Sequence, residues 1–396
     1  MRRPTPQRLK TFACRIYHLA AYLKAPGDGR VRPRIPAQVL LWGQLIGHIF
    51  REASFHGMEA LARCPARAGL GLEQGFGDDT LAYFDERLDL QPTRRALASL
   101  AQQAKNNKAF DRSAFIGLAV DGSGAGFFRE SGCPLCHVVR HSEHGLIGHR
   151  HKLCMVAIVG TPIPLPVDIE PHRPGEGEAN ASLRLLQRSV RTLGRRFADY
   201  VVADAEYARA PFLHGVGDLG LHSVVRLKQN LPELYEAAQQ RFSQIPPSSV
   251  FEEHNQRIEL WDAGDFDPWE SLRWPTVRVL RYRQHKPDGT VVEAYWLTDL
   301  PITRASSRAL YRMAKSRWEI ENEGFNEAKT HHWLEHVPHH QENAVIAHWL
   351  LLLLALALER LYRLRWLHRG NHPVMTSIEL LRALRFSVAA RWLDTS

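Results

Sequence analysis

The sequence predicts an α/β protein in which a mixed sheet flanked by helices follows a helical region and carries a β-rich insertion. Three observations support this fold class. Residues 36–110 have apolar side chains at helical spacing. From residue 114 the pattern changes to short apolar runs of strand length that alternate with helical segments. Residues 246–302 then show the alternation that is typical of half-buried strands.

The helical region spans residues 1–110. Its clearest periodic segments are residues 37–50 and 80–100, and the glycine-containing turn at residues 75–79 lies between them. We expect a helix in each segment, with Asp79 or Thr80 capping the second. Periodicity leaves open whether these helices form a helix-turn-helix.

The first part of the core spans residues 111–245. Its apolar runs are short and continuous, as expected for strands that are buried on both faces of a sheet. The expected elements are the strands 114–120, 153–159 and 163–169, the helix 178–193, and the strands 200–203 and 223–227.

The β-rich insertion spans residues 246–302. Strands are expected at residues 276–282 and 291–297, and Lys286-Pro287-Asp288-Gly289 between them has the composition of a hairpin turn. The insertion therefore interrupts the α/β core.

The chain ends with a helical part of the core, residues 303–396, where long helices are expected at 306–329 and 344–366. The apolar run Ala344–Leu358 has 15 residues, fewer than the ~20 that a membrane span requires. We therefore expect a buried helix and no association with a membrane.

Basic residues concentrate at both ends of the chain. The formal net charge is +9; residues 1–35 hold nine Lys or Arg and one acid, and residues 360–392 hold seven Arg and one Glu. Basic ends around a mildly acidic middle indicate a polyanionic partner held by the flanks, with a cation-binding centre between them. The alternative, that both ends are only solvated basic faces, stays open.

Two aspartates directly follow expected buried strands, Asp121 after Val120 and Asp204 after Ala203. Ligand sites gather at such strand ends because side chains there leave the core and converge over one edge of the sheet. Carboxylates suit Mg²⁺, and two of them with a third acid can form a two-metal site for phosphoryl transfer. A single strand-end aspartate is more often a cap or turn residue, so the third acid is decisive.

The third acid lies in the segment Arg317-Trp318-Glu319-Ile320-Glu321. Arg317 and Glu321 are four residues apart and share one face of the expected helix. The segment resembles the arginine-tryptophan-x-isoleucine-glutamate core of the Tyr-Arg-Glu-Lys signature in bacterial insertion-sequence transposases of the DDE class. Two positions differ: Ala314 stands where the signature has tyrosine, and Lys329 lies one residue farther from Glu321.

The resemblance has consequences for the fold and the site. It implies an RNase H-like core with the β-rich insertion between the second and third acids. It matches Asp121, Asp204 and Glu321 to the family's catalytic carboxylates, and it assigns Arg317 and Lys329 to DNA phosphates near the active site. Members of the family act as dimers on paired DNA ends, so it also implies a homodimer on double-stranded DNA.

The expected reaction follows from these residues. Asp121, Asp204 and Glu321 would hold two Mg²⁺ or Mn²⁺ ions, water would cut the DNA at a terminal inverted repeat, and the freed 3′ hydroxyl would attack target DNA. The helical region and the basic ends would bind the duplex, mostly through phosphates, and the basic side chains nearest the N-terminus are Arg2, Arg3, Arg8 and Lys10. Two alternatives stay open: a decayed or repurposed transposase homologue that only binds DNA, and an RNase H-like nuclease without strand transfer.

A cysteine-histidine cluster lies between the first two core strands. Cys133-Pro134-Leu135-Cys136 is followed by several histidines, including His149 and His151, and by Cys154, at spacings close to those of zinc fingers. A related subgroup of the same transposases has a similar Cys-x-x-Cys and a histidine that heads the second strand, a place that His151 fits.

We predict a structural zinc ion held by Cys133, Cys136 and His151, with His149 or Cys154 as the fourth ligand and sulfurs ~3.5–4 Å apart. The alternative is a hairpin with free thiols whose histidines face DNA. The cysteine count is odd and the N-terminus lacks the apolar stretch of a secretory signal, so we expect reduced thiols and a cytoplasmic protein.

Overall fold

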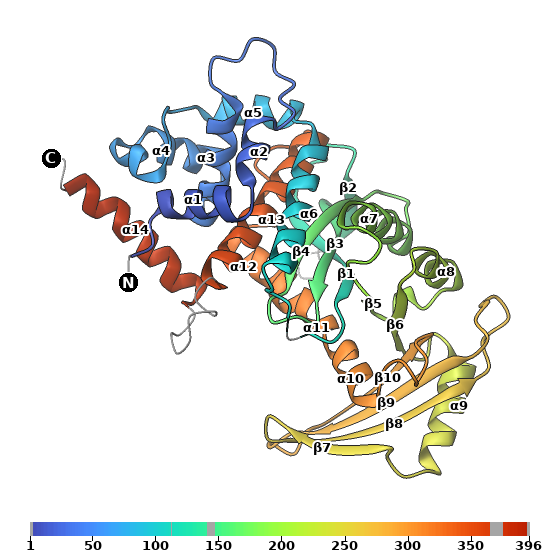
Figure 1. Ribbon diagram of the computed structural model, residues 1–396. Helices are drawn as coiled ribbons and strands as arrows, with labels where there is room; N and C mark the ends of the chain where they lie inside the picture. Colours follow the sequence, from blue (N-terminus) through green and yellow to red (C-terminus); the bar gives the residue numbers. More distant parts are fainter. Residues whose placement is uncertain (1–2, 112, 141–146, 365–374, 394–396) are drawn as a thin grey trace.

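The computed structural model describes residues 3–111, 113–140, 147–364 and 375–393 (Figure 1). Helices fill the first part of the chain, as predicted. They are α1 (Pro6–Ile16), α2 (Leu19–Lys24), α3 (Ala37–Ile49), α4 (Phe55–Arg63), the 3-10 segment η1 (Pro65–Leu70), α5 (Asp78–Arg87) and α6 (Leu90–Asn106). The single helix expected at residues 80–100 is wrong: it is broken into α5 and α6 because Asp89 caps α6, accepting a hydrogen bond from Gln91 N at 2.9 Å.

The described strands form one mixed sheet. They are β1 (Gly117–Phe128), β2 (Cys136–Arg140), β3 (Ile147–Val159), β4 (Leu165–His172), β5 (Tyr200–Ala203), β6 (His222–Leu227), β7 (Ser249–Glu253), β8 (Gln256–Phe266), β9 (Val277–His285) and β10 (Val291–Thr298). Their order is β2-β3-β1-β5-β6-β10-β9-β8-β7, and β4 also pairs with β3. β1, β5 and β6 are parallel, whereas β3 and β4 are antiparallel to their neighbours. This arrangement confirms the predicted RNase H-like fold class.

The β-rich insertion continues the core sheet. β10 pairs with β6 in antiparallel register, with Tyr295 opposite Leu227, and β9, β8 and β7 follow outward. The hairpin turn before β10 has the predicted place: Lys286 N donates to Thr290 O at 2.9 Å, and Gly289 has φ +82°. In Figure 1 these strands extend to the end of the molecule opposite the helical region.

Helices cover both faces of the core. The remaining ones are α7 (Glu178–Leu193), η2 (Ala205–Tyr207), α8 (Ala210–Asp218), α9 (Pro232–Ser243), α10 (Ser307–Lys315), α11 (Arg317–Glu319), the π-helical segment η3 (Ile320–Asn326), α12 (Glu327–His332), α13 (Glu342–Leu364) and α14 (Ser377–Leu393). Neighbouring residues of β3 show the two faces: the Cys154 thiol contacts Glu178 in α7, whereas Met155 lies against Gly324 in η3.

Helix α13 joins the helical region to the sheet. It packs against β4, α3, α5 and α6. It is long and apolar enough to cross a membrane by length and composition, but its most apolar window is entirely buried inside the protein. This confirms the expectation of a buried helix.

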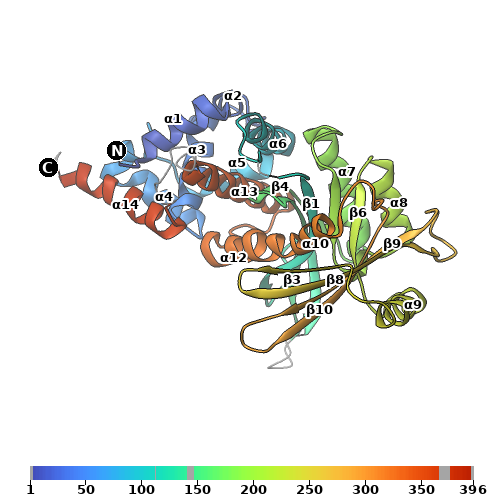
Figure 2. The ribbon, with the colours of Figure 1, turned by 60° about the horizontal axis from the view of Figure 1, so that its bottom comes forward.

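The helix expected at residues 306–329 follows a helical path, but its hydrogen-bonding pattern changes. The backbone conformation stays right-handed helical at Ser316 and Ile320, where α10 gives way to α11 and then to η3. Figure 2 shows this segment leading from the insertion strands back to the helical region. The change of pattern falls on the residues that carry the third predicted acid.

Candidate active site

Asp121 and Asp204 lie at the same level on neighbouring strands of the sheet. Asp121 lies inside β1 instead of after it, which corrects the expected strand end, because β1 keeps pairing with β3 as far as Ala125. The parallel pairing of β1 with β5 ends earlier, at Ala119 and Val202. Continuing this register by two residues sets Asp121 beside Asp204, on strands that are spaced ~4.8 Å apart.

Glu321 is linked to Asp121 by the side chain of Arg317, which contacts both carboxylates. Arg317 Nη2 is 2.5 Å from Glu321 Oε1, and Arg317 Nη1 is 3.6 Å from Asp121 Oδ2. The Arg317 side chain is only 9% exposed, and its charge also acts on Asp204. The resemblance assigned this guanidinium to DNA phosphates; in the structure it is held among the three acids.

Two hydrogen bonds, one of them buried, hold the helical segment that carries Glu321. Tyr200 in β5 and Ser316 share a hydrogen bond of 3.0 Å between their hydroxyls, and Gly160 N donates to Glu319 Oε2 at 2.9 Å. The Tyr200 ring lies over Gly117 so closely that a Cβ there would be 2.3 Å from it. These contacts therefore hold the helical segment against the sheet and leave little freedom for the backbone near Glu321.

The neighbouring glutamates of the segment are used elsewhere. The carboxylate of Glu319 accepts the Gly160 N–H, and burial raises its pKa to about 7. Glu323 lines a cavity of about 690 Å³ with Arg360, and its backbone oxygen accepts a hydrogen bond from that guanidinium. Of these three acids, Glu321 is the one whose carboxylate contacts Arg317.

The π-helical segment η3 also bears on Lys329. A π-turn closes i→i+5 instead of i→i+4 and so contains one more residue than an α-turn. This accounts for the extra residue between Glu321 and Lys329. Lys329 lies in α12, where its Nζ is 3.0 Å from Glu335 Oε1.

The two aspartates have opposite electrostatic environments. Burial raises the pKa of Asp121 to about 7, and the charges of Glu321 and Glu178 act in the same direction, although Arg317 opposes them. Asp204 is different. Burial tends to raise its pKa, but other groups hold that pKa below the usual value.

The groups that lower the pKa of Asp204 are at its own strand end. Ala205 N donates to Asp204 Oδ1 at 2.7 Å, and Lys228 Nζ is 3.3 Å from the same oxygen. Arg317 adds a further positive charge. Near neutral pH, Asp204 is therefore ionised while Asp121 is close to its midpoint.

Sequence reasoning missed Glu178, a fourth acid near this site. It begins α7, and its carboxylate lies so close to Gly122 that a Cβ there would be 2.3 Å from it. Tyr207 Oη donates to Glu178 Oε1 at 2.8 Å. An acid in the first turn of a helix is common because of the helix dipole, so Glu178 carried no distinct signal. The glycine directly after Asp121 was the only hint.

Basic residues beside Asp204 were missed as well. Arg209, Arg226 and Lys228 line a cavity of about 750 Å³ at the carboxyl end of β6. Lys228 also pairs with Asp204. These residues lie in a part of the sequence with no unusual charge density, so composition gave no reason to select them.

The basic residues predicted near the N-terminus differ in their surroundings. Arg3 and Arg8 are exposed, and Arg8 Nη1 donates to Arg3 O at 2.5 Å. Lys10 is half-buried: its Nζ donates to Gly71 O at 3.0 Å and lies 5.4 Å from the Trp42 ring centroid. Arg2 lies outside the described residues.

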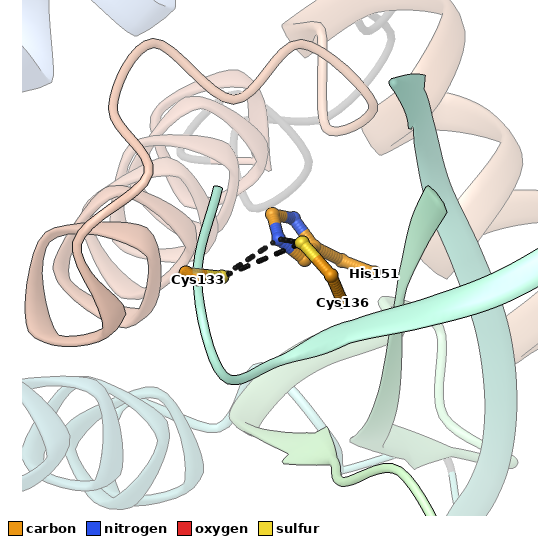
Figure 3. A group of neighbouring side chains, drawn as sticks. All are labelled: Cys133, Cys136 and His151. Atoms are coloured by element: carbon orange, nitrogen blue, oxygen red, sulfur yellow. Dashed lines mark hydrogen bonds between the residues drawn. The ribbon is translucent and has the colours of Figure 1, made fainter. Parts of the chain in front are cut away.

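Cys133, Cys136 and His151 form a compact group (Figure 3). The sulfurs are 3.8 Å apart, within the range expected for two zinc ligands, and His151 Nε2 lies 3.1 Å from Cys133 Sγ and 3.4 Å from Cys136 Sγ. Burial lowers the pKa of His151 to about 4, so its imidazole is neutral, the state that binds metals. All five cysteines of the chain are free.

The expected fourth ligands are not part of this group. Cys154 is three residues from His151 on β3, so it points to the opposite face, where its Sγ contacts Glu178 O at 3.9 Å. Cys154 therefore lies on the face of the sheet opposite to the Cys133, Cys136 and His151 group and does not serve as its fourth ligand. His149, two residues from His151, also lies outside the group of mutually close ligand atoms.

Comparison with known proteins identifies the family. The fold is RNase H-like, with carboxylates just beyond the point where the parallel pairing of β1 with β5 ends. Residues 137–358 match the family described as Transposase DDE domain, and because this is more than half of the 396 residues, the chain belongs to that family. The match includes Asp204 and Glu321 and begins after Asp121.

Among solved structures, the cryo-EM structure of a piggyBac transposase synaptic complex with hairpin DNA is similar. Its TM-score is 0.50 at 10% identity, and the likeness covers 99% of this chain and 81% of that one. At this identity the likeness concerns the fold alone. No curated protein matches the sequence.

Proposed function

We propose that this protein is a DDE transposase that cuts DNA at the ends of a mobile element and joins the freed 3′ ends to target DNA. One observation carries the proposal. Asp121 and Asp204 leave adjacent parallel strands at the same level, and a single guanidinium, that of Arg317, joins Asp121 to Glu321. Membership of the transposase family supports the same class of enzyme.

The three acids fit a pair of divalent cations. Their donors are all carboxylate oxygens, which Mg²⁺ and Mn²⁺ prefer, and two of the carboxylates already share a cationic group, the Arg317 guanidinium. We propose that Asp121, Asp204 and Glu321 hold these ions. When bound, the ions supply positive charge at the attacking and leaving oxygens of an in-line displacement.

The side chains around the acids prepare this site. Arg317 offsets the repulsion between Asp121 and Glu321, and a guanidinium released from the acids would be placed to donate to a phosphate oxygen. Against the effect of burial, the Ala205 N–H and then Lys228 hold the pKa of Asp204 below its usual value. With Arg209 and Arg226, Lys228 gives the adjacent cavity a positive lining that suits a DNA strand near its scissile phosphate.

The duplex is proposed to bind at the helical end of the molecule. The two basic ends of the chain are far apart in sequence, yet α1 and α14 lie at the same end of the protein in Figure 1. Arg3 and Arg8 are exposed there. The similar piggyBac structure is a complex with hairpin DNA, which supports a DNA partner, and the transposase resemblance supports a homodimer on paired ends.

A plasmid assay tests the proposal. Supercoiled DNA that carries the element's own ends is incubated with the full-length protein, with Mg²⁺ or with EDTA. We expect cleavage at the ends and joining to a second plasmid only with Mg²⁺. Glu321→Gln should lower both by orders of magnitude. Glu323→Gln is the matched control: burial raises the pKa of Glu323 and favours its neutral form, which glutamine resembles.

Each outcome separates the alternatives. Cleavage without joining would indicate a nuclease, and specific DNA binding without cleavage would indicate a decayed or repurposed homologue. Wild-type rates for Glu321→Gln would contradict the assignment of the third acid.

A further inference from the structure

The loop between α12 and α13 brings His340 to the cysteine-histidine group. Gly132, next to Cys133, makes room for it: a Cβ at this position would lie 2.7 Å from His340 Cγ. The His340 ring stands edge-on to Phe128, with centroids 4.8 Å apart, and its centroid is 6.1 Å from that of His151. His340 therefore packs directly beside the three mutually close ligands.

One ring nitrogen of His340 has no hydrogen-bond partner among the described residues. Its Nδ1 is buried and accepts or donates no hydrogen bond among the described residues. The adjacent His339 is different, because its Nδ1 accepts from Gln341 N at 3.0 Å and its Nε2 lies 3.2 Å from Glu86 Oε1. The Nδ1 atoms of His149 and His151 are also buried and unpaired, but His340 is the histidine that packs on Gly132, next to Cys133. Because buried polar atoms are normally satisfied, this position favours His340 as the ligand that completes the group.

We propose that His340 is the fourth ligand of a tetrahedral zinc ion that is also held by Cys133, Cys136 and His151. With Zn–S near 2.3 Å and Zn–N near 2.0–2.1 Å, tetrahedral geometry requires about 3.8 Å between sulfurs and about 3.6 Å between sulfur and nitrogen. The structure has 3.8 Å for the first and 3.1 and 3.4 Å for the second. Two imidazoles on one such ion have centroids about 5 Å apart, compared with 6.1 Å between His151 and His340. His340 is not yet among the ligand atoms that lie within 4.8 Å of one another, so its ring has to move toward the other three when the ion binds.

This ion would connect three segments of the chain. Cys133 lies in the connection from β1 to β2 and Cys136 begins β2, His151 is in β3, and His340 follows α12. The same loop already touches β1, because a Cβ on Gly126 would be 2.9 Å from Glu335 O. Since α12 continues directly from η3, the zinc ion would link the segment that carries Glu321 to β3, which pairs with β1, the strand of Asp121.

Metal binding by the full-length protein tests the inference. The purified chain is stripped with a chelator and titrated with Zn²⁺, and Co²⁺ is used as a spectroscopic substitute. We expect one tightly bound ion per chain and a Co²⁺ spectrum of a four-coordinate site with two thiolates. His340→Ala should weaken zinc binding at least tenfold and change the Co²⁺ ligand-field bands, because water replaces an imidazole. His339→Ala is the matched control and should change neither.

A second variant covers the case in which His340→Ala does not fold. His340→Cys keeps a ligand at this position, so its Co²⁺ complex should stay four-coordinate and gain a third thiolate charge-transfer contribution. An unchanged two-thiolate spectrum in His340→Cys, unchanged zinc affinity in His340→Ala, or a wild-type chain that binds no zinc would each overturn the inference. None of these readouts involves DNA cleavage, so the outcome is separate from that of the proposed transposase activity.

Discussion

Competition between protons and Mg²⁺ at Asp121 gives a quantitative test of the active site. The pKa of Asp121 is about 7, raised first by burial and then by the charges of Glu321 and Glu178. A protonated carboxyl is a poor ligand, so binding of Mg²⁺ below this pH must displace a proton. For one proton, the half-saturating Mg²⁺ concentration scales with 1 + 10^(pKa − pH). It should therefore be about tenfold higher at pH 6 than at pH 8, which corresponds to about 1.4 kcal/mol.

A single charge change should move this dependence. Glu178→Gln removes a negative charge next to Asp121, lowers the pKa of Asp121 and so shifts the rise in the required Mg²⁺ concentration to lower pH. Glu270→Gln removes the same charge from an exposed position between β8 and β9 and serves as the control. Plasmid cleavage is titrated with Mg²⁺ from pH 6 to pH 8, and binding of Mn²⁺ without DNA is followed in parallel. Equal half-saturating concentrations at pH 6 and pH 8 would refute the reasoning.

Three further predictions concern catalysis, DNA binding and stability. Asp204→Asn should lower cleavage by orders of magnitude, because it removes a carboxylate ligand of the metal ions. DNA binding in a mobility-shift assay should stay the same or become tighter, because the substitution removes a negative charge that faces a polyanion. Wild-type cleavage would exclude Asp204 from catalysis. Replacing Arg3 and Arg8 by alanine should weaken DNA binding and reduce the salt slope by up to about 0.9 per lost phosphate contact, and an unchanged slope would place the duplex elsewhere. Burial lowers the pKa of His348 to about 3, below its unfolded value near 6.5, so its protonation in the unfolded chain destabilises the protein as pH falls below 6.5. His348→Leu should remove on the order of 2 kcal/mol of the stability lost between pH 7.5 and pH 5 in denaturation curves, whereas leucine at the exposed His56 should not.

Much of the fold was predictable from local sequence. The helix at 178–193 and the strand at 200–203 have the predicted bounds, because an amphipathic period and a short apolar run between turn residues each specify one element without outside help. The three acids were proposed from the same kind of information: two aspartates after apolar runs, and a glutamate in a signature-like segment. Local patterns could also place Cys133 and Cys136 together, because they are separated by only two residues.

Only the tertiary structure decided how these residues combine. The register of β1 on β5 sets Asp121 beside Asp204, and the docking of η3 brings Glu321, and not Glu319 or Glu323, to Arg317. Glu178 acts on Asp121, and His340 packs beside the cysteine-histidine group, from segments that are distant in the sequence. A local sequence pattern does not show which distant segments will be in contact. Cys154 shows the reverse case. Its spacing suits a ligand, but side chains alternate along a strand, so three residues from His151 it faces α7 on the other side of the sheet.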